Sequence, residues 1–161
     1  MGKWILNASP LIFLGRLEQI GLVEKLCDEV IVPRDVADEI TAGPAEDQAR
    51  RWIEGSGSSF IKPVPFLPPP VAAWDLGKGE SAVLALGYLD RKKEIVVDDR
   101  AARNCAKALE IKFLGTLSVI LRAKKLGHIK KASPLLRRLV DQGYRIDQHT
   151  FDRAVQLAGE G

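Results

Sequence analysis

Short apolar runs alternate along the chain with segments in which apolar residues recur every three or four positions. The short runs predict strands at residues 4–6, 30–33, 95–97 and 113–114. The periodic segments predict helices over residues 9–17, 22–26, 34–42, 46–54, 78–91, 100–110, 116–126, 133–142 and 148–158. This alternation is typical of an α/β protein with a parallel sheet covered by helices on both faces.

Proline marks several boundaries in this pattern. Ser9-Pro10 and Ser133-Pro134 each predict an N-cap followed by a first-turn proline of a helix. Residues 62–70 (KPVPFLPPP) hold five of the nine prolines and predict a stiff connector, because proline is excluded from helix interiors and central strands. The connector is expected to lie against the body of the protein because of apolar residues within and just before it, namely Phe60, Ile61, Val64, Phe66 and Leu67.

Length and composition favour one domain over residues 1–161, with the connector at 62–70 and a basic helical part at 116–161. Hydrophobic residues make up 46% and charged residues 28%, which excludes a disordered or fibrous chain. No run reaches the roughly 18 apolar residues of a membrane span, and the N-terminal run reads as a strand entering a helix rather than a targeting segment. The two cysteines, Cys27 and Cys105, are too few for a disulfide framework, so a cytoplasmic location is expected.

Charge is distributed unevenly along the chain. Residues 1–99 carry 11 basic and 16 acidic side chains, whereas residues 100–161 carry 13 basic and 5 acidic ones. An acidic part joined to a basic part suggests a polyanionic partner held beside a group of carboxylates. Two solvated faces with no partner would give the same pattern.

Polar residues follow two of the predicted strands. Asn7 ends the first strand, and Asp98 and Asp99 end the third candidate strand. The carboxyl ends of parallel strands share one edge of a sheet, where ligands bind in such folds. Local roles are the alternative: Asp99 as N-cap of the next helix and Asn7 in an Asx-turn. Because neighbours in a strand face opposite ways, only one of the two aspartates is expected to point at the site.

Two glutamates lie on otherwise apolar helix stripes. Glu80 shares its stripe with Val83 and Leu84, and Glu39 shares its stripe with Ile40. An unpaired buried charge is costly, which favours a partner for each carboxylate. The alternatives are a first-turn glutamate favoured by the helix dipole for Glu80 and a solvated edge position for Glu39.

Together these acids predict one acidic pocket that a divalent cation would stabilise. Neighbouring carboxylates raise one another's pKa values, and a bound cation removes that penalty. Oxygen ligands without histidine or cysteine favour Mg²⁺ or Mn²⁺ over zinc, and His128 and His149 are expected at the surface. Such an ion suits phosphodiester hydrolysis, because it activates water and neutralises charge on the phosphate.

Five motifs occur in a family-like order: NASPLI (7–12), VPRDVADEI (32–40), GKGESAVLAL (77–86), VVDDRAAR (96–103) and FLGTLSVI (113–120). In this order they resemble the PIN domain, and more closely its PIN-like branch named domain of unknown function 3368 (DUF3368). The resemblance implies a three-layer α/β/α sandwich with a central parallel sheet. It also implies an Mg²⁺- or Mn²⁺-dependent ribonuclease acting on RNA, in bacteria and archaea often a dimeric toxin inhibited by an antitoxin protein.

The resemblance assigns roles to individual residues. Catalytic carboxylates would be Glu39, Glu80 and Asp99, the metal ligands would be these with Asn7 and Asp98, and Ser9 and Thr116 would support them. Asn7 stands where the family usually has the first metal-binding aspartate, so one negative charge is missing. Weaker metal binding follows from this, and a non-catalytic nucleic-acid- or partner-binding module remains the alternative. A phosphoacceptor signalling domain is disfavoured, since no acidic pair lies near the first strand.

Basic residues of the second part could line a path for nucleic acid. The candidates are Arg100, Arg103, Arg122, Lys124 and Lys125. Solvated helix faces are the alternative. No aromatic residue interleaves with the dense basic stretch at 122–138, so base stacking is not expected there.

Overall fold

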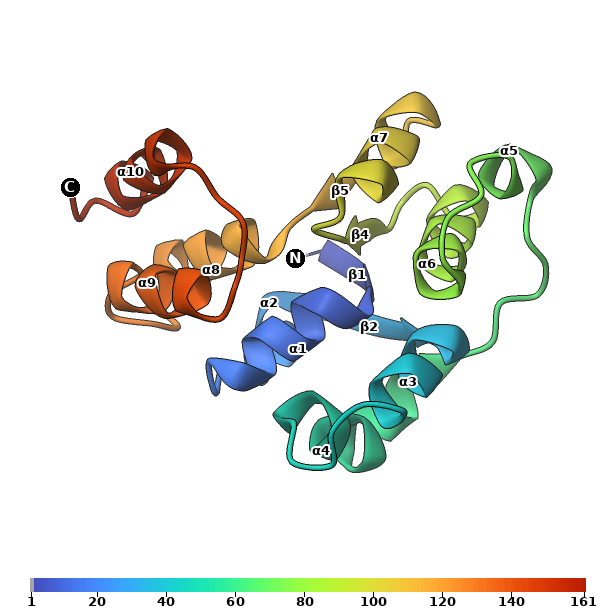
Figure 1. Ribbon diagram of the computed structural model, residues 1–161, viewed down its shortest axis with the longest axis horizontal. Helices are drawn as coiled ribbons and strands as arrows, with labels where there is room; N and C mark the ends of the chain where they lie inside the picture. Colours follow the sequence, from blue (N-terminus) through green and yellow to red (C-terminus); the bar gives the residue numbers. More distant parts are fainter. Residues whose placement is uncertain (1) are drawn as a thin grey trace.

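The computed structural model describes residues 2–161 and shows helices on both sides of a central sheet (Figure 1). All strand pairs are parallel, in the order β3-β2-β1-β4-β5. The strands are β1 (Gly2–Leu6), β2 (Cys27–Pro33), β3 (Ile61–Lys62), β4 (Glu94–Val96) and β5 (Phe113–Leu114). The predicted three-layer α/β/α fold is confirmed. In the part of the chain that is described, no helix is long and apolar enough to span a bilayer.

The helices connect these strands and form the outer layers. They are α1 (Ala8–Arg16), α2 (Leu22–Leu26), α3 (Arg34–Thr41), α4 (Gln48–Glu54), α5 (Pro69–Ala72), α6 (Lys78–Leu89), α7 (Arg100–Ala108), α8 (Thr116–Lys125), α9 (Ser133–Asp141) and α10 (Gln148–Leu157), with a 3₁₀ turn at Ser56–Phe60. The C-terminal helices α8, α9 and α10 lie together on one side of the molecule, opposite α5 and α6 (Figure 1).

The strand order creates a crossover point between β1 and β4. The chain runs outward from β1 through β2 to β3, then returns to the other side of β1 to form β4 and β5. Leu6 of β1 is in register with Val96 of β4, so the two strands end side by side. Because helices leave these two ends in opposite directions around the sheet, a crevice is expected here, and the fold brings Asn7 and Asp98 to its edge.

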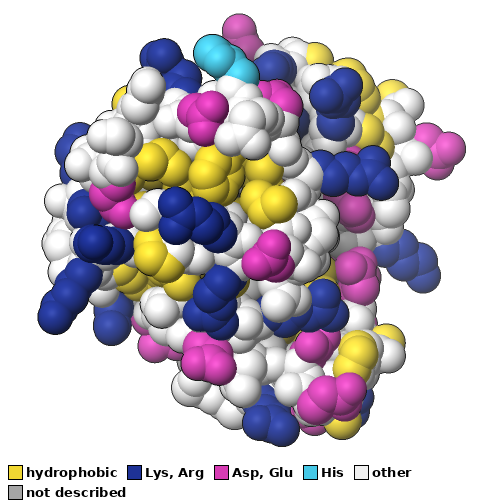
Figure 2. Space-filling model, turned by 60° about the vertical axis from the view of Figure 1, so that its left-hand side comes forward, with side chains coloured by type: hydrophobic (Ala, Val, Ile, Leu, Met, Phe, Trp, Pro, Cys, Tyr) yellow, Lys and Arg dark blue, Asp and Glu magenta, His cyan; other side chains and the backbone are white. Residues whose placement is uncertain are grey.

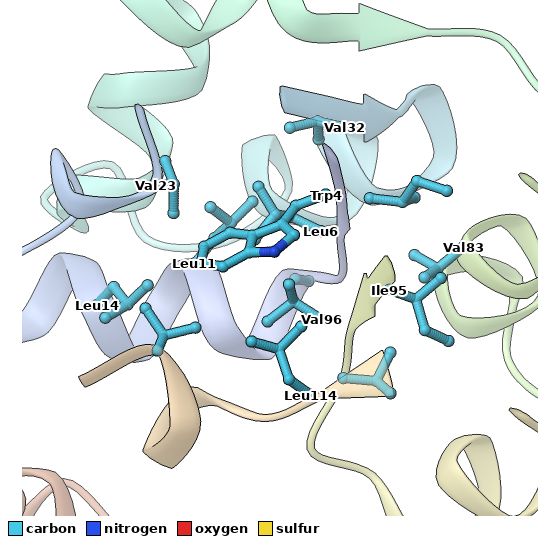
Figure 3. Close-up of a cluster of buried hydrophobic side chains, with 14 of the residues drawn as sticks. Trp4, Leu6, Leu11, Leu14, Val23, Val32, Val83, Ile95, Val96 and Leu114 are labelled. Atoms are coloured by element: carbon cyan, nitrogen blue, oxygen red, sulfur yellow. The ribbon is translucent and has the colours of Figure 1, made fainter. Parts of the chain in front are cut away.

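The alternation of side chains along β1 and β4 divides the core between the two faces. Trp4 and Leu6 are fully buried and lie toward Leu11 of α1 (Figure 3). Ile95 points to the other face, where it lies beside Val83 of α6 (Figure 3). Both faces are therefore buried, as a parallel sheet requires, and the strands read as nearly continuous apolar runs.

Helix α6 is seated very close to the sheet. A methyl group on Gly87 would lie 2.8 Å from Ile95 Cγ2 and 2.9 Å from Ile111 Cγ2, closer than real contacts allow. The missing side chain therefore lets the helix backbone rest directly on β4 and on the segment before β5.

The connector at 62–70 is only partly as predicted. Residues Ile61 and Lys62 add a short edge strand, and Pro69 begins α5, where a first-turn proline is tolerated. Phe60 and Ile61 pack against the core as expected, whereas Phe66 and Leu67 are 56% and 44% exposed, so for these two the expectation is wrong. The prolines keep the segment extended between the sheet edge and α5, and within it only Pro68 is buried.

Two helix starts also differ from the prediction. Helix α1 begins at Ala8 with Asn7 as the N-cap residue, so Ser9 and Pro10 lie within its first turn. At α9 the capping carboxylate comes from Glu160, beyond α10. Its side chain accepts hydrogen bonds from the N–H groups of Ala132 at 2.7 Å and Ser133 at 3.1 Å, and from Ser133 Oγ at 2.8 Å.

Glu160 therefore ties the end of the chain to α8 and α9. Lys124 Nζ lies 3.3 Å from its carboxylate. The hydrogen bond from the Ala132 N–H, followed by those from Ser133 and Lys124, lowers the pKa of Glu160 from 4.5 to about 2. A lowered folded-state pKa contributes stability that is complete above pH 4.5 and is lost as the pH falls toward 2.

The variant Glu160→Gln is expected to be less stable than the parent at pH 7, with the difference shrinking as the pH falls from 4.5 to 2. Glutamine keeps the size but loses the charge that the three donors and Lys124 favour. Thermal unfolding followed by circular dichroism between pH 2 and 7 measures the difference. Glu46→Gln, on an exposed loop, serves as the control. An unchanged difference across this pH range would contradict the capping role.

Candidate functional site

Asn7 lies at the tight turn from β1 into α1. Its N–H donates to the Val96 carbonyl at 3.1 Å, which fixes the turn against the end of β4. Its side chain is only 3% exposed, and its Oδ1 is buried without a hydrogen-bond partner among residues 2–161. A buried acceptor without a partner is rare and costly, so a hydrogen-bond donor or a cation beside this oxygen would stabilise it.

The first turn of α6 brings a second oxygen to the same place. A methyl group on Gly79 would lie 3.0 Å from Glu39 Oε1 and 3.5 Å from Asn7 Oδ1. Both oxygens therefore lie next to the backbone of Gly79, and a side chain there would first displace the Glu39 carboxylate. Glu39 reaches this point from α3, so three elements distant in the sequence meet here.

The negative charge of Glu80 acts on the Glu39 carboxylate. Glu80 stands in the first turn of α6, next to Gly79. Partial burial raises the pKa of Glu39, and the neighbouring charge of Glu80 raises it further. The structure thus brings Asn7, Glu39 and Glu80 together as a group of two like-charged carboxylates and one unpartnered amide oxygen.

This group fits a hard divalent cation. Oxygen-only donors with two negative charges match the preferences of Mg²⁺ and Mn²⁺, and a cation would satisfy Asn7 Oδ1 and relieve the repulsion between the glutamates. Within residues 2–161 no three His, Cys, Asp or Glu side chains are placed to share one ion. The group therefore contains two carboxylates and one amide oxygen, and in this arrangement Asp98 and Asp99 do not form a cluster of three carboxylates with Glu39 or Glu80.

Asp98 is held by a dense set of donors. Its Oδ1 accepts hydrogen bonds from the Thr116 N–H at 2.9 Å and from Tyr144 Oη at 2.8 Å, and its Oδ2 accepts one from Thr116 Oγ1 at 2.6 Å. Arg103 Nη2 lies 4.0 Å away. Burial and the negative charge of Asp98 raise the pKa of Tyr144, so the phenol stays protonated as a donor. Asp98 thereby joins the start of α8 to the segment after α9.

Asp99 has the local role named above as its alternative. It is the N-cap of α7, and its Oδ2 accepts a hydrogen bond from the Ala102 N–H at 3.0 Å. Asp99 is exposed, at the rim of the site. The strand itself ends at Val96, two residues before Asp98 and three before Asp99, so their directions are set by these contacts rather than by strand alternation.

A cavity of about 1220 Å³ lies beside the group formed by Asn7, Glu39 and Glu80. Its acidic wall contains Glu80, Asp98 and Asp99, and Ser9 of α1 also lines it. The other lining residues are mostly basic or aromatic. They are Phe13, Arg100, Arg103, Asn104, Lys107, Gly143, Tyr144 and Arg145. Glu80 is thus the residue shared by the carboxylate pair and the cavity.

Most of the basic and aromatic residues that line the cavity were not predicted from the sequence. Asn104 and Lys107 stand four and seven residues after Arg100, so helical periodicity alone could have placed them on one face. Tyr144 and Arg145 lie more than 30 residues from α7, in a segment without periodic pattern. Nothing local in the sequence points them toward this cavity.

The other basic candidates are engaged elsewhere or face solvent. Arg122 pairs with Glu94 at 3.3 Å, and Lys124 pairs with Glu160 at 3.3 Å. Lys125 is exposed, as are both histidines, His128 and His149. On the face that carries the C-terminal side of the molecule, basic and acidic side chains are interspersed around apolar ones (Figure 2). The excess positive charge of residues 100–161 does not form a continuous basic surface on this face.

Comparison with known proteins identifies the family. The family model DUF3368, described as a PIN domain, matches residues 3–160. No protein with a curated description matches the chain significantly. PIN domains are generally metal-dependent nucleases. A parallel sheet in this order, acids at its crossover point and a match over nearly the whole chain together show that this chain belongs to the PIN domain family, in its DUF3368 branch.

Proposed function

We propose that this protein is an Mg²⁺- or Mn²⁺-dependent ribonuclease whose ion is held by Asn7, Glu39 and Glu80. The observation that carries the proposal is the buried, unpartnered Asn7 Oδ1, which faces the same point as Glu39 Oε1. When bound, the ion supplies an activated water and neutralises charge on the phosphate.

The chain's own residues would place the RNA against this ion. Arg100 and Arg103 line the cavity next to Glu80 and would bind phosphate oxygens. Asp98 holds Thr116 and Tyr144 in position and supports the cavity floor, while Asp99 fixes the start of α7 and with it the direction of Arg100 and Arg103. Ser9 is exposed at the same rim and would donate a hydrogen bond to the substrate.

Calorimetric titration with Mn²⁺ and Mg²⁺ tests the metal site, and cleavage of mixed RNA with and without EDTA tests the activity. We expect binding below millimolar ion, because the ion relieves the repulsion from Glu80 that helps to raise the pKa of Glu39. The variant Asn7→Asp, which adds the missing charge, is expected to bind Mn²⁺ more tightly. If neither protein binds an ion at millimolar concentration, the proposal is wrong.

A non-catalytic nucleic-acid- or partner-binding module is the second candidate. The neutral Asn7 favours it, as do the hydrogen bonds that occupy Asp98 and Asp99. Metal binding without cleavage of any RNA would support this candidate over the nuclease.

The family resemblance adds two further predictions about partners. Inhibition by an antitoxin protein and assembly into a homodimer both stay predictions, because they rest on the resemblance alone. Sedimentation velocity at micromolar protein would distinguish a dimer from a monomer.

A further inference from the structure

The basic wall of the cavity is a continuous stripe on α7. Arg100, Arg103, Asn104 and Lys107 follow the spacing i, i+3, i+4 and i+7, which places them on one helix face. The helix begins at Arg100, directly after the N-cap residue Asp99, so the stripe leads away from the acids over about 10 Å from Arg100 to Lys107. A nucleic-acid strand presents more than one phosphate over this length.

Arg145 extends the basic wall from the segment between α9 and α10. Among residues 2–161, Arg100, Lys107 and Arg145 make no ion pair with a carboxylate, although each is exposed and lines the cavity. Lys107 Nζ instead lies 6.0 Å from the centre of the Phe113 ring, which Arg103 also covers at 5.7 Å. These unpaired cations contrast with Arg122 and Lys124, whose charges are already neutralised.

Two aromatic rings complete the cavity. Phe13 of α1 and Tyr144 meet edge to face, with ring centres 5.4 Å apart and planes at 78°. The Tyr144 hydroxyl is fixed by Asp98 at 2.8 Å. Both rings are half-buried, so each retains exposed surface within the cavity. A ring held from both ends is preorganised and binds a planar group with little loss of entropy.

We propose that the segment Gly143–Arg145 and helix α7 form a nucleotide subsite, in which an unpaired base lies against Tyr144 and Phe13 and the flanking phosphates bind Lys107 and Arg145. The proposal rests on the proposed function for the identity of the polymer, and adds which residues select an unpaired nucleotide. Stacking on an aromatic ring requires an exposed base face, and in a duplex the neighbouring base pairs cover that face.

Binding without cleavage tests the phosphate contacts. The probe is a fluorescein-labelled single-stranded RNA 12-mer of mixed sequence, measured by fluorescence anisotropy in EDTA at several KCl concentrations. Lys107→Gln and Arg145→Gln are each expected to weaken binding and to reduce the slope of log affinity against log salt by about 0.7, the value for one phosphate contact on a single strand. Lys62→Gln and Lys92→Gln, which are also exposed and do not line the cavity, are the matched controls and should leave the slope unchanged.

The ring is tested separately from the charges. Tyr144→Leu is expected to weaken binding of the single strand about ten-fold with an unchanged salt slope, since it removes stacking but no charge. Tyr144→Phe keeps the ring and should bind nearly as the parent does. An oligonucleotide without bases should bind the parent and Tyr144→Leu equally. Circular dichroism melts of each variant confirm that the protein is folded.

Several results would overturn the subsite. These are unchanged salt slopes in Lys107→Gln and Arg145→Gln, unchanged affinity in folded Tyr144→Leu, or duplex RNA bound as tightly as the single strand. The proposed function fails independently, by the absence of metal binding and cleavage. A protein that binds RNA through these residues in EDTA but never cleaves it would keep the subsite and remove the nuclease.

Discussion

Replacing Glu39 by glutamine is expected to lower the rate of RNA cleavage at saturating Mn²⁺ by at least about 100-fold, because loss of even an outer partner of a metal ligand costs about 10–100-fold. Glutamine removes the negative charge of the carboxylate that lies on the same side of Gly79 as the unpartnered Asn7 Oδ1. Single-turnover cleavage of a labelled RNA measures the effect without a contribution from product release.

The same variant should make the metal-free protein slightly more stable at neutral pH. Burial and the charge of Glu80 raise the pKa of Glu39, and a raised carboxyl pKa means that stability is lost as the pH rises through it. Glutamine avoids that loss, so activity and stability should change in opposite directions. Asp38→Asn, the exposed neighbour on α3, is the matched control and should change neither. Cleavage by Glu39→Gln at the parental rate would refute the role of this carboxylate.

Replacing Trp4 by alanine is expected to cost about 3–5 kcal/mol of unfolding free energy. Trp4 is fully buried in β1, between the neighbouring strands and α1 (Figure 3). Nothing adjacent can fill the space of an indole, because the surrounding core is packed on both faces of the sheet. Urea denaturation followed by circular dichroism measures the loss.

Two other substitutions make this prediction specific. Trp74→Ala, at a 38% exposed position, should cost far less. Trp4→Phe should also cost less than Trp4→Ala, since it keeps a ring and removes an indole N–H that has no partner among the described residues. Equal losses for Trp4→Ala and Trp74→Ala would show that β1 is not the centre of the core.

The fold was predictable because its elements have strong local patterns. The strand at 95–97 and the helices 22–26 and 148–158 appear within one residue of their predicted bounds. Strand β2 begins three residues earlier than predicted, at Cys27, because Asp28 and Glu29 interrupt the apolar run. Cys27 and Glu29 nevertheless pair with β1, with a shift of register between them. Strand β3 has only two residues and leaves no periodic signal.

The site was only partly predictable, because contacts between distant residues decide it. Periodicity and strand ends pointed to Asn7, Glu39 and Glu80, which the structure brings together. These patterns did not indicate that Thr116 and Tyr144 would donate hydrogen bonds to Asp98, since the two residues lie 18 and 46 positions away from it. The charge asymmetry of the sequence was likewise a poor guide, because Glu94 and Glu160 neutralise basic residues far from them in the chain.

The close seat of α6 has a consequence for how the carboxylate site is built. Gly87 and Glu80 lie two turns apart on α6, and the missing side chain of Gly87 determines how closely this helix packs on β4. A larger residue at position 87 would tilt or lift α6 and move the Glu80 carboxylate away from Glu39, although no residue near that carboxylate had been changed. The distance between the two carboxylates therefore depends on a residue near the other end of the helix, which is not one of the proposed ligands.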